Sequence, residues 1–266
     1  MMMQAGWQTA VFADGEKADN SLQAIYDRIM TGTSFSEEDF KKVRGAFQYM
    51  SVEKADGIVV DGDSSDWEQY QGMPMPTLDT QYQVYIDDGR DKDATGIAKF
   101  AYDEEKFYFM IAVEDDQHVY ETGTSYWSGD SLQIAVSNMD ETYGTEIGMI
   151  HNASTGEGEI YGDAFSPDQM AKINLKTSQQ GTKTIYECSI PWTVKFRYGM
   201  PDKLKFCVII NDNDGYGRRY CVELAPGIAE GKTKVKFPVL ELAKESKPWY
   251  GWSQNDLSAD MGEDLN

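Results

Sequence analysis

The sequence is poor in the residues that most often carry catalysis or hold a transition metal. Among 266 residues there are two histidines, His118 and His151, and three cysteines. Neither histidine lies in an HExxH motif or a recognisable triad setting, and no P-loop or GxGxxG motif is present. The three cysteines include no CxxC pair, which argues against a zinc site or a disulfide framework. We therefore expect a non-catalytic protein with free, buried thiols.

Positive charge is also scarce. Lys and Arg number 24 against 45 Asp and Glu, which gives a formal net charge of −21. Nucleic acid and anionic membranes would repel such a chain, so neither is an expected partner. Neutral ligands, cations such as calcium, and basic proteins remain.

Long apolar runs are missing. No stretch of about eighteen apolar residues is present, so no transmembrane helix is expected. The first residues, Met-Met-Met-Gln-Ala-Gly-Trp, lack the basic region and apolar core of a signal peptide. That would suit a cytoplasmic protein, or equally an excised domain.

Aromatic residues, in contrast, are abundant. They make up 12% of the chain, with 16 Tyr and 6 Trp, which suits strands and surfaces that stack on flat ligands. Short strand-like segments are separated by Gly, Asp and Asn turns, and no long helical crossover lies between them. We expect an all-β protein, an antiparallel β-sandwich of the jelly-roll kind. The predicted strands cover residues 81–86, 97–102, 106–113, 131–136, 184–190, 204–210, 219–224 and 235–240.

The chain divides into three zones. Residues 1–57 carry helical patterns, including a capping box that begins at Ser36, and predict a short helical extension of two helices that runs to about Met50. Residues 58–243 contain the predicted strands. Residues 244–266 form an acidic tail that includes Trp249 and Trp252. The extension either packs on the sandwich or is the remnant of a preceding region.

Two segments are rich in side-chain oxygens and are considered as calcium-binding loops. The run from Asp61 to Asp66 places carboxylates two and three residues apart, and a solvated loop is the interpretation we favour. Asp212-Asn213-Asp214-Gly215 lacks the spacing and the terminal Glu of an EF-hand, so it is interpreted as a turn.

Five short motifs, taken in order, resemble the family-9 carbohydrate-binding modules. Each alone is weak, but their order along the chain is fairly specific. They are Val60-Asp61-Gly62 with Asp66-Trp67, the hairpin of residues 102–109 running on to Val113-Glu114-Asp115, Trp127-Ser128-Gly129-Asp130-Ser131-Leu132-Gln133-Ile134, Ile190-Pro191-Trp192, and Val208-Ile209-Ile210-Asn211-Asp212.

The resemblance implies a β-sandwich, structural calcium, and a slot that holds the ends of plant-type polysaccharides such as xylan or cellulose between two tryptophans. Such modules are usually extracellular and joined to polysaccharide-degrading enzymes, so an appended catalytic domain is an expected partner. Trp127, Gln133 and Asn211 fall where the family contacts sugar. Asp115 and Asp130 fall where carboxylates bind calcium. Trp67 and Trp192 lie in motifs that we interpret as core.

The sequence differs from the family pattern at several sugar-contacting positions, which weakens the expectation of sugar binding. Gln133 replaces a family acid, and Gly148 and Ile209 stand where sugar-binding members supply an Arg and a Gln. The second Trp, expected between Leu224 and Val235, is missing. The alternative function is a structural or interaction domain that has lost the sugar slot. A third hypothesis is an enzyme whose catalytic domain lies outside this chain.

Overall fold

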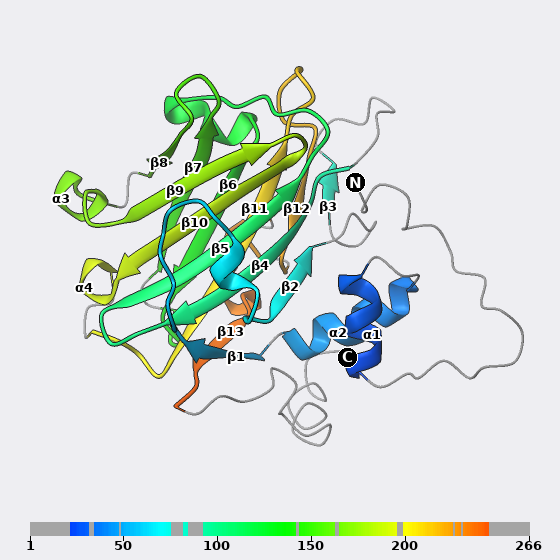
Figure 1. Cartoon of the computed structure of the whole chain (residues 1–266), viewed down its shortest axis with the longest axis vertical. Helices are drawn as coiled ribbons and strands as arrows, with labels where there is room; N and C mark the ends of the chain where they lie inside the picture. The colour runs from blue at the N-terminus through cyan, green and yellow to red at the C-terminus, as the bar shows by residue number, and fades with distance from the viewer. Residues whose placement is uncertain are drawn as a thin grey trace, which may run out of the picture.

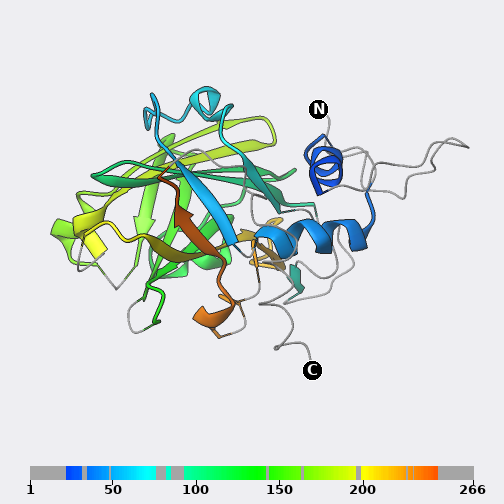
Figure 2. The same cartoon turned by 90° about the horizontal axis from the view of Figure 1, so that it is seen from below.

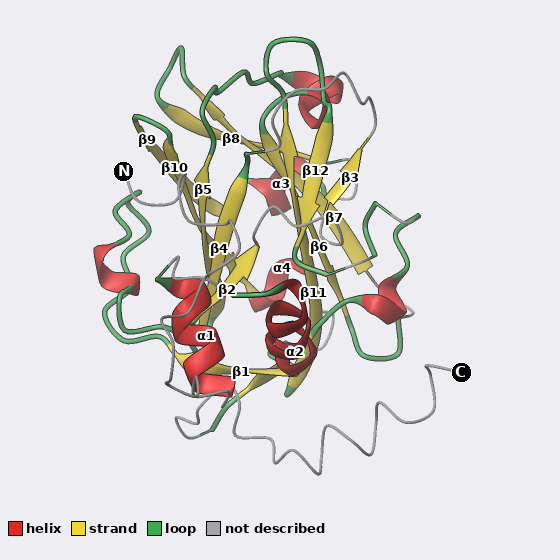
Figure 3. Ribbon diagram, turned by 90° about the vertical axis from the view of Figure 1, so that its right-hand side faces the viewer, coloured by secondary structure: helices red, strands yellow, loops and turns green. Residues whose placement is uncertain are grey.

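The structure is a computed structural model of the chain. It describes residues 22–31, 35–47, 49–75, 82–84, 93–141, 144–162, 165–195, 199–225, 227–229 and 231–244. Thirteen strands are described, with four short or medium α-helices and three 3-10 turns. Two sheets face one another as layers, and the helices α1 (Leu22–Met30) and α2 (Glu37–Phe47) lie at one end (Figures 1 and 3).

The first layer, called the β6 sheet, carries the candidate site. Its strands run in the order β8 (Glu157–Tyr161), β7 (Gly144–Asn152), β6 (Ser131–Ser137), β11 (Lys203–Asp212), β13 (Val239–Leu242) and β1 (Tyr49–Lys54). Strand β12 (Tyr220–Glu223) also pairs with β11, and β3 (Tyr82–Val84) pairs with β12.

The second layer is called the β5 sheet. It contains β1, β4 (Thr95–Tyr102), β5 (Lys106–Glu114), β10 (Lys183–Pro191) and β9 (Asn174–Gln180), with β2 (Gly72–Met75) paired to β4. The remaining short helices are α3 (Pro167–Met170) and α4 (Trp192–Lys195). The 3-10 turns are η1 (Ser65–Trp67), η2 (Gly123–Ser128) and η3 (Lys234–Lys236).

Alternation along the central strands explains how the layers pack. On β11 the side chains of Phe206, Val208 and Ile210 enter the main core, whereas Cys207 and Ile209 face the opposite side of the sheet. Phe206 contacts Phe100 from the β5 sheet with ring centroids 4.8 Å apart and nearly perpendicular planes, a favourable edge-to-face arrangement. The aromatic richness of the sequence is therefore largely used between the layers.

The predicted all-β sandwich is confirmed, with one difference in strand direction. Strand β1 pairs in parallel with both β13 and β4 and so joins the two sheets, while the other described pairings are antiparallel. We had assigned residues up to about Met50 to a helix, and that end was wrong. Helix α2 ends at Phe47, and β1 begins at Tyr49 with the alternating pattern of a strand.

Most predicted strands are present, but five strands of the structure were not predicted. These are β1, β2, and the three strands β7, β8 and β9, whose sequences are interrupted by Gly or are almost entirely polar. These last three lie toward the sheet edges, where only one face meets the core. The predicted strand at 235–240 was partly wrong: residues 234–236 form η3, and β13 begins at Val239.

The amino-terminal helices pack into the same core as the sandwich. Ile25, Ile29, Phe40 and Val43 are all nearly inaccessible to solvent and belong to the main cluster. The Tyr26 hydroxyl also donates to the Gly72 carbonyl at 2.8 Å. Figure 2 shows both helices against one end of the layers. Strand β1 lies on the amino-terminal side of the boundary predicted at residue 57.

Several smaller expectations are confirmed. Trp67 and Trp192 are core residues, with 0% and 2% of their surface exposed. Cys188, Cys207 and Cys221 are free and buried. Within the described residues, no helix is long and apolar enough to cross a membrane.

Candidate functional site

Trp127 stands on the outer side of the β6 sheet, in the turn η2 that precedes β6. It is 43% exposed, whereas Trp residues are highly buried on average. The turn is closed by the Gly129 amide, which donates to the Tyr126 carbonyl at 3.2 Å. An exposed indole fixed by a short turn provides a rigid, flat apolar surface.

Gln133 and Asn211 lie beside each other on the outward face of the same sheet. In the pairing of β6 with β11, Ser131 is opposite Asn211 and Gln133 is opposite Ile209. The Asn211 amide Nδ2 donates to Ser131 Oγ at 3.0 Å and to Gln133 Oε1 at 3.3 Å. The structure therefore brings two of the three predicted sugar-contacting residues into one network.

Arg218 connects this network to Trp127. It lies in the loop between β11 and β12, and its guanidinium carbon is 5.0 Å from the centroid of the Trp127 ring. Its Nη1 donates to Asn211 Oδ1 at 2.8 Å and to Gln133 Oε1 at 3.3 Å. Sequence reasoning missed Arg218. The available signal was an adjacent Arg pair, Arg218-Arg219, in a chain with few basic residues.

The structure explains why residue 148 is a glycine, which the family resemblance did not. It lies opposite Gln133 on β7, and a Cβ at this position would be 2.0 Å from the Tyr126 ring. Tyr126 stacks on Tyr161 at 5.6 Å between centroids with planes 5° apart. The place of the expected Arg is therefore filled by an aromatic pair.

The position of the expected second Trp is also occupied differently. Ile228 and Phe237 are buried on the outward face of the β6 sheet, where they pack with Cys207, Ile209 and Cys221. Ile209 is only 1% exposed and therefore cannot replace the polar side chain of the family. Trp249 and Trp252 of the acidic tail lie outside the described residues.

A cluster of acids lies near the ends of the strands that lead to this platform. One carboxylate oxygen from each of Asp93, Asp115, Asp116 and Asp214 lies within 4.8 Å of the others. Calcium binds oxygen ligands at about 2.3–2.6 Å, so two ligands of one ion are at most about 5 Å apart. The cluster thus fits a calcium ion. Asp214 comes from the segment that we interpreted only as a turn.

Burial and mutual repulsion make this cluster unfavourable when all its members are ionised. Burial, followed by the charge of Asp212, raises the pKa of Asp115 to about 8. Burial raises the pKa of Asp212 to about 7, although the neighbouring Tyr220 hydroxyl opposes the shift. Burial and the nearby Asp116 raise the pKa of Asp93 to about 6. A bound cation would relieve this repulsion.

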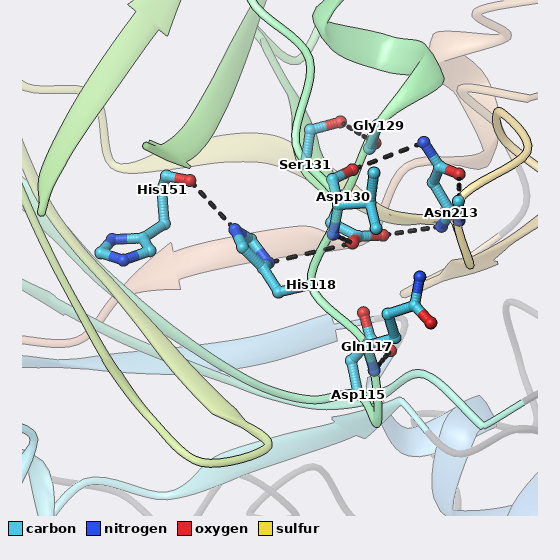
Figure 4. Close-up of polar contacts among 10 residues, drawn as sticks. Asp115, Gln117, His118, Gly129, Asp130, Ser131, His151 and Asn213 are labelled. Carbon is cyan, nitrogen blue, oxygen red and sulfur yellow. Dashed lines mark hydrogen bonds and ion pairs between the residues drawn. The ribbon is translucent and has the colours of Figure 1, made fainter. Parts of the chain in front are cut away.

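Asp130 has a different local role from Asp115. Its two carboxylate oxygens accept hydrogen bonds from the backbone amides of Val119 and Asn213, the latter at 2.6 Å (Figure 4). His118 Nδ1 lies 3.9 Å from the same carboxylate. Asp130 thereby pins the segment carrying Trp127 to the loop carrying Arg218. The structure places Asp115, but not Asp130, in the four-acid cluster.

A sheet face with an exposed indole at its edge, a polar network and an oxygen-rich cluster defines a sandwich of the ligand-binding kind. The family model described as carbohydrate family 9 binding domain-like matches residues 60–224, and the chain belongs to this family. The resemblance drawn from the five motifs is therefore confirmed.

Solved structures share the fold. A carbohydrate binding module family 9 (CBM9) from Caldicellulosiruptor kristjanssonii in complex with cellotriose has a TM-score of 0.57 at 15% identity, over 75% of this chain and 95% of that one. The structure of such a module from the same organism in complex with glucose has a TM-score of 0.58 at 16% identity, over 75% and 98%. No curated protein matches the chain.

Proposed function

We propose that this protein is a non-catalytic carbohydrate-binding module that holds a saccharide against Trp127. The observation that carries the proposal is the exposed indole, fixed at the edge of an outward polar network in a family-9 sandwich. The apolar face of a pyranose stacks on an indole, and nearby polar groups hold its hydroxyls. Cellotriose and glucose, the ligands of the similar structures, support a ligand of this class.

The platform is one-sided in the described part of the chain. Ile228 and Phe237 cover the adjoining sheet surface, and Arg218 lies over the Trp127 ring. A single stacking surface buries less of a sugar than a slot between two rings, so we expect weaker affinity than such a slot provides. The ends of plant-type polysaccharides, such as xylan and cellulose, are the proposed ligands.

Calcium is the proposed structural ion of the module. Asp93, Asp115, Asp116 and Asp214 would hold it, and the buried Asp212 would add negative charge nearby. The ion would neutralise these carboxylates and join the two segments that carry Trp127 and Arg218. We further propose that the protein works at the cell surface or outside the cell, next to an appended catalytic domain. The family assignment supports this setting.

One specific observation favours the alternative of a structural or interaction domain. Tyr126 fills the space above Gly148, and Ile209 is buried, so two positions of the family site are closed by apolar packing. A domain that had lost the sugar slot would show this packing and bind no glycan.

Binding measurements separate the two functions. Affinity gels with xylan and soluble cellulose derivatives, and calorimetry with cellotriose and xylotriose, should detect binding by the wild type. Trp127→Ala should abolish it, because the stacking surface is removed. Tyr216→Ala is the matched control, since Tyr216 is 66% exposed on a neighbouring loop but stacks with Arg219 instead. Absence of binding to every glycan would refute the proposed function and favour the alternative.

A further inference from the structure

The two amide side chains of the platform are already engaged with protein groups. Asn211 Oδ1 accepts from Arg218, and its Nδ2 donates to Ser131 and Gln133. Gln133 Oε1 accepts from Asn211 and Arg218, and its Nε2 donates to Glu146 Oε1 at 3.0 Å. An amide offers two donor hydrogens and one acceptor oxygen, so little capacity is left for a sugar hydroxyl. The side chains of Asn211 and Gln133 are therefore better suited to hold another protein group in place than to contact a sugar.

The group that Asn211 and Gln133 hold in place is the guanidinium of Arg218. Nη1 is fixed by both amide oxygens, and the group lies over the Trp127 ring. The side chain is partly exposed, at the rim of the sheet face. A guanidinium is planar and carries five donor hydrogens in a fixed arrangement, so one held in this way is pre-organised for hydroxyl oxygens.

We propose that Arg218 is the hydrogen-bonding residue of the saccharide site, and that Asn211 and Gln133 position it. The proposal rests on the proposed function and deepens it. The ligand class is a saccharide whose adjacent hydroxyl oxygens accept from the guanidinium beside Trp127. Asn211 and Gln133 are positioning residues that act through Arg218, which differs from the direct contact implied by the family resemblance.

Arg218→Gln tests the role of the guanidinium. Titration calorimetry would use cellotriose or xylotriose, whichever the wild type binds. A hydrogen bond from a charged group contributes about 1.5–3 kcal/mol, so we expect affinity to fall about tenfold to a hundredfold. Arg218→Lys should remain weakened, because an ammonium lacks the planar donor set. Arg219→Gln is the matched control: it removes the same charge from the same loop, and affinity should stay within about twofold.

A double-mutant cycle tests the positioning role. Asn211→Ala alone should weaken binding, whereas the same change in the Arg218→Gln background should have almost no further effect. Additive losses would mean that Asn211 contacts the sugar directly, and would overturn the proposal. Melting temperatures of all variants would confirm that each is folded.

The possible failures are distinguishable. If the wild type binds a saccharide and Arg218→Gln binds it equally well, the role of Arg218 is refuted while the proposed function stands. If the wild type binds no saccharide, both are refuted.

Discussion

The acid cluster should make the stability of this protein depend on pH and calcium together. In the folded state the pKa of Asp115 is raised to about 8, whereas an unfolded Asp has its ordinary value near 4. Between these values the folded state holds more protons than the unfolded state, so stability falls as pH rises. Without calcium, the protein should therefore be less stable at pH 8 than at pH 5.

The size of this pH effect on stability follows from Asp115 alone. The raised pKa values of Asp93 and Asp212 partly reflect the same repulsion, so their contributions are not added to that of Asp115. A single carboxyl whose pKa moves from 3.8 to about 8 lowers the free energy of unfolding by at most about 4 kcal/mol between pH 5 and pH 8. One kcal/mol corresponds to about 2–4 °C in Tm for a domain of this size, so we expect Tm to fall by up to about 8–16 °C.

Calcium should reverse the effect at high pH. An ion present at one hundred times its Kd stabilises the folded state by about 2.7 kcal/mol, or roughly 5–10 °C in Tm. At pH 5 the gain should be much smaller, because bound protons compete with the ion. Differential scanning calorimetry with chelator or calcium, at pH 5 and pH 8, measures all four states.

Two variants distinguish the effect of the acid cluster from the general charge repulsion within a chain of net charge −21. Asp115→Asn should raise the metal-free Tm at pH 8 and reduce the calcium response. Asp202→Asn, at an exposed position away from the cluster, should behave as the wild type. A metal-free Tm that is constant from pH 5 to pH 8, together with no response to calcium, would refute the reasoning.

Three further predictions concern the stability of the fold. Gly148→Ala should lower the free energy of unfolding by about 1–3 kcal/mol, because a Cβ there meets the Tyr126 ring. An unchanged Tm would show that Tyr126 moves freely. Glu187→Ala should lower the free energy of unfolding, measured with urea, by about 3 kcal/mol or more, because the Trp67 indole N–H and two backbone amides lose their acceptor. Glu187→Gln should lower it by less. A chain beginning at residue 58 should not melt cooperatively, since burial of Ile25, Phe40 and two further core residues contributes about 6–12 kcal/mol; a sharp transition near the wild-type Tm would contradict an integral extension.

The class of fold was accessible from the sequence because it depends on local patterns. The continuous apolar run of residues 106–113, the alternation along 131–136 and the hairpin at Asp103 specify strands and their order along the chain without long-range information. The exposed Trp127 and the acids at 115 and 130 were recognisable by the motifs around them. Strands β8 and β9 were not, because a polar edge strand is stabilised by its neighbour and not by its own composition.

What only the tertiary structure decided is which side chains meet. Asp93, Asp115 and Asp214 are far apart in the chain, and their convergence depends on the pairing of β5 and β11 with neighbours elsewhere. Arg218 reaches Trp127 across some ninety positions because Asp130 fastens their two loops together. Local patterns determine elements and their order, whereas sites arise from contacts that close long loops. The sequence by itself therefore determined a family-9 sandwich with Trp127 as its candidate platform, and the fold decided that this indole is exposed and that an arginine lies over it.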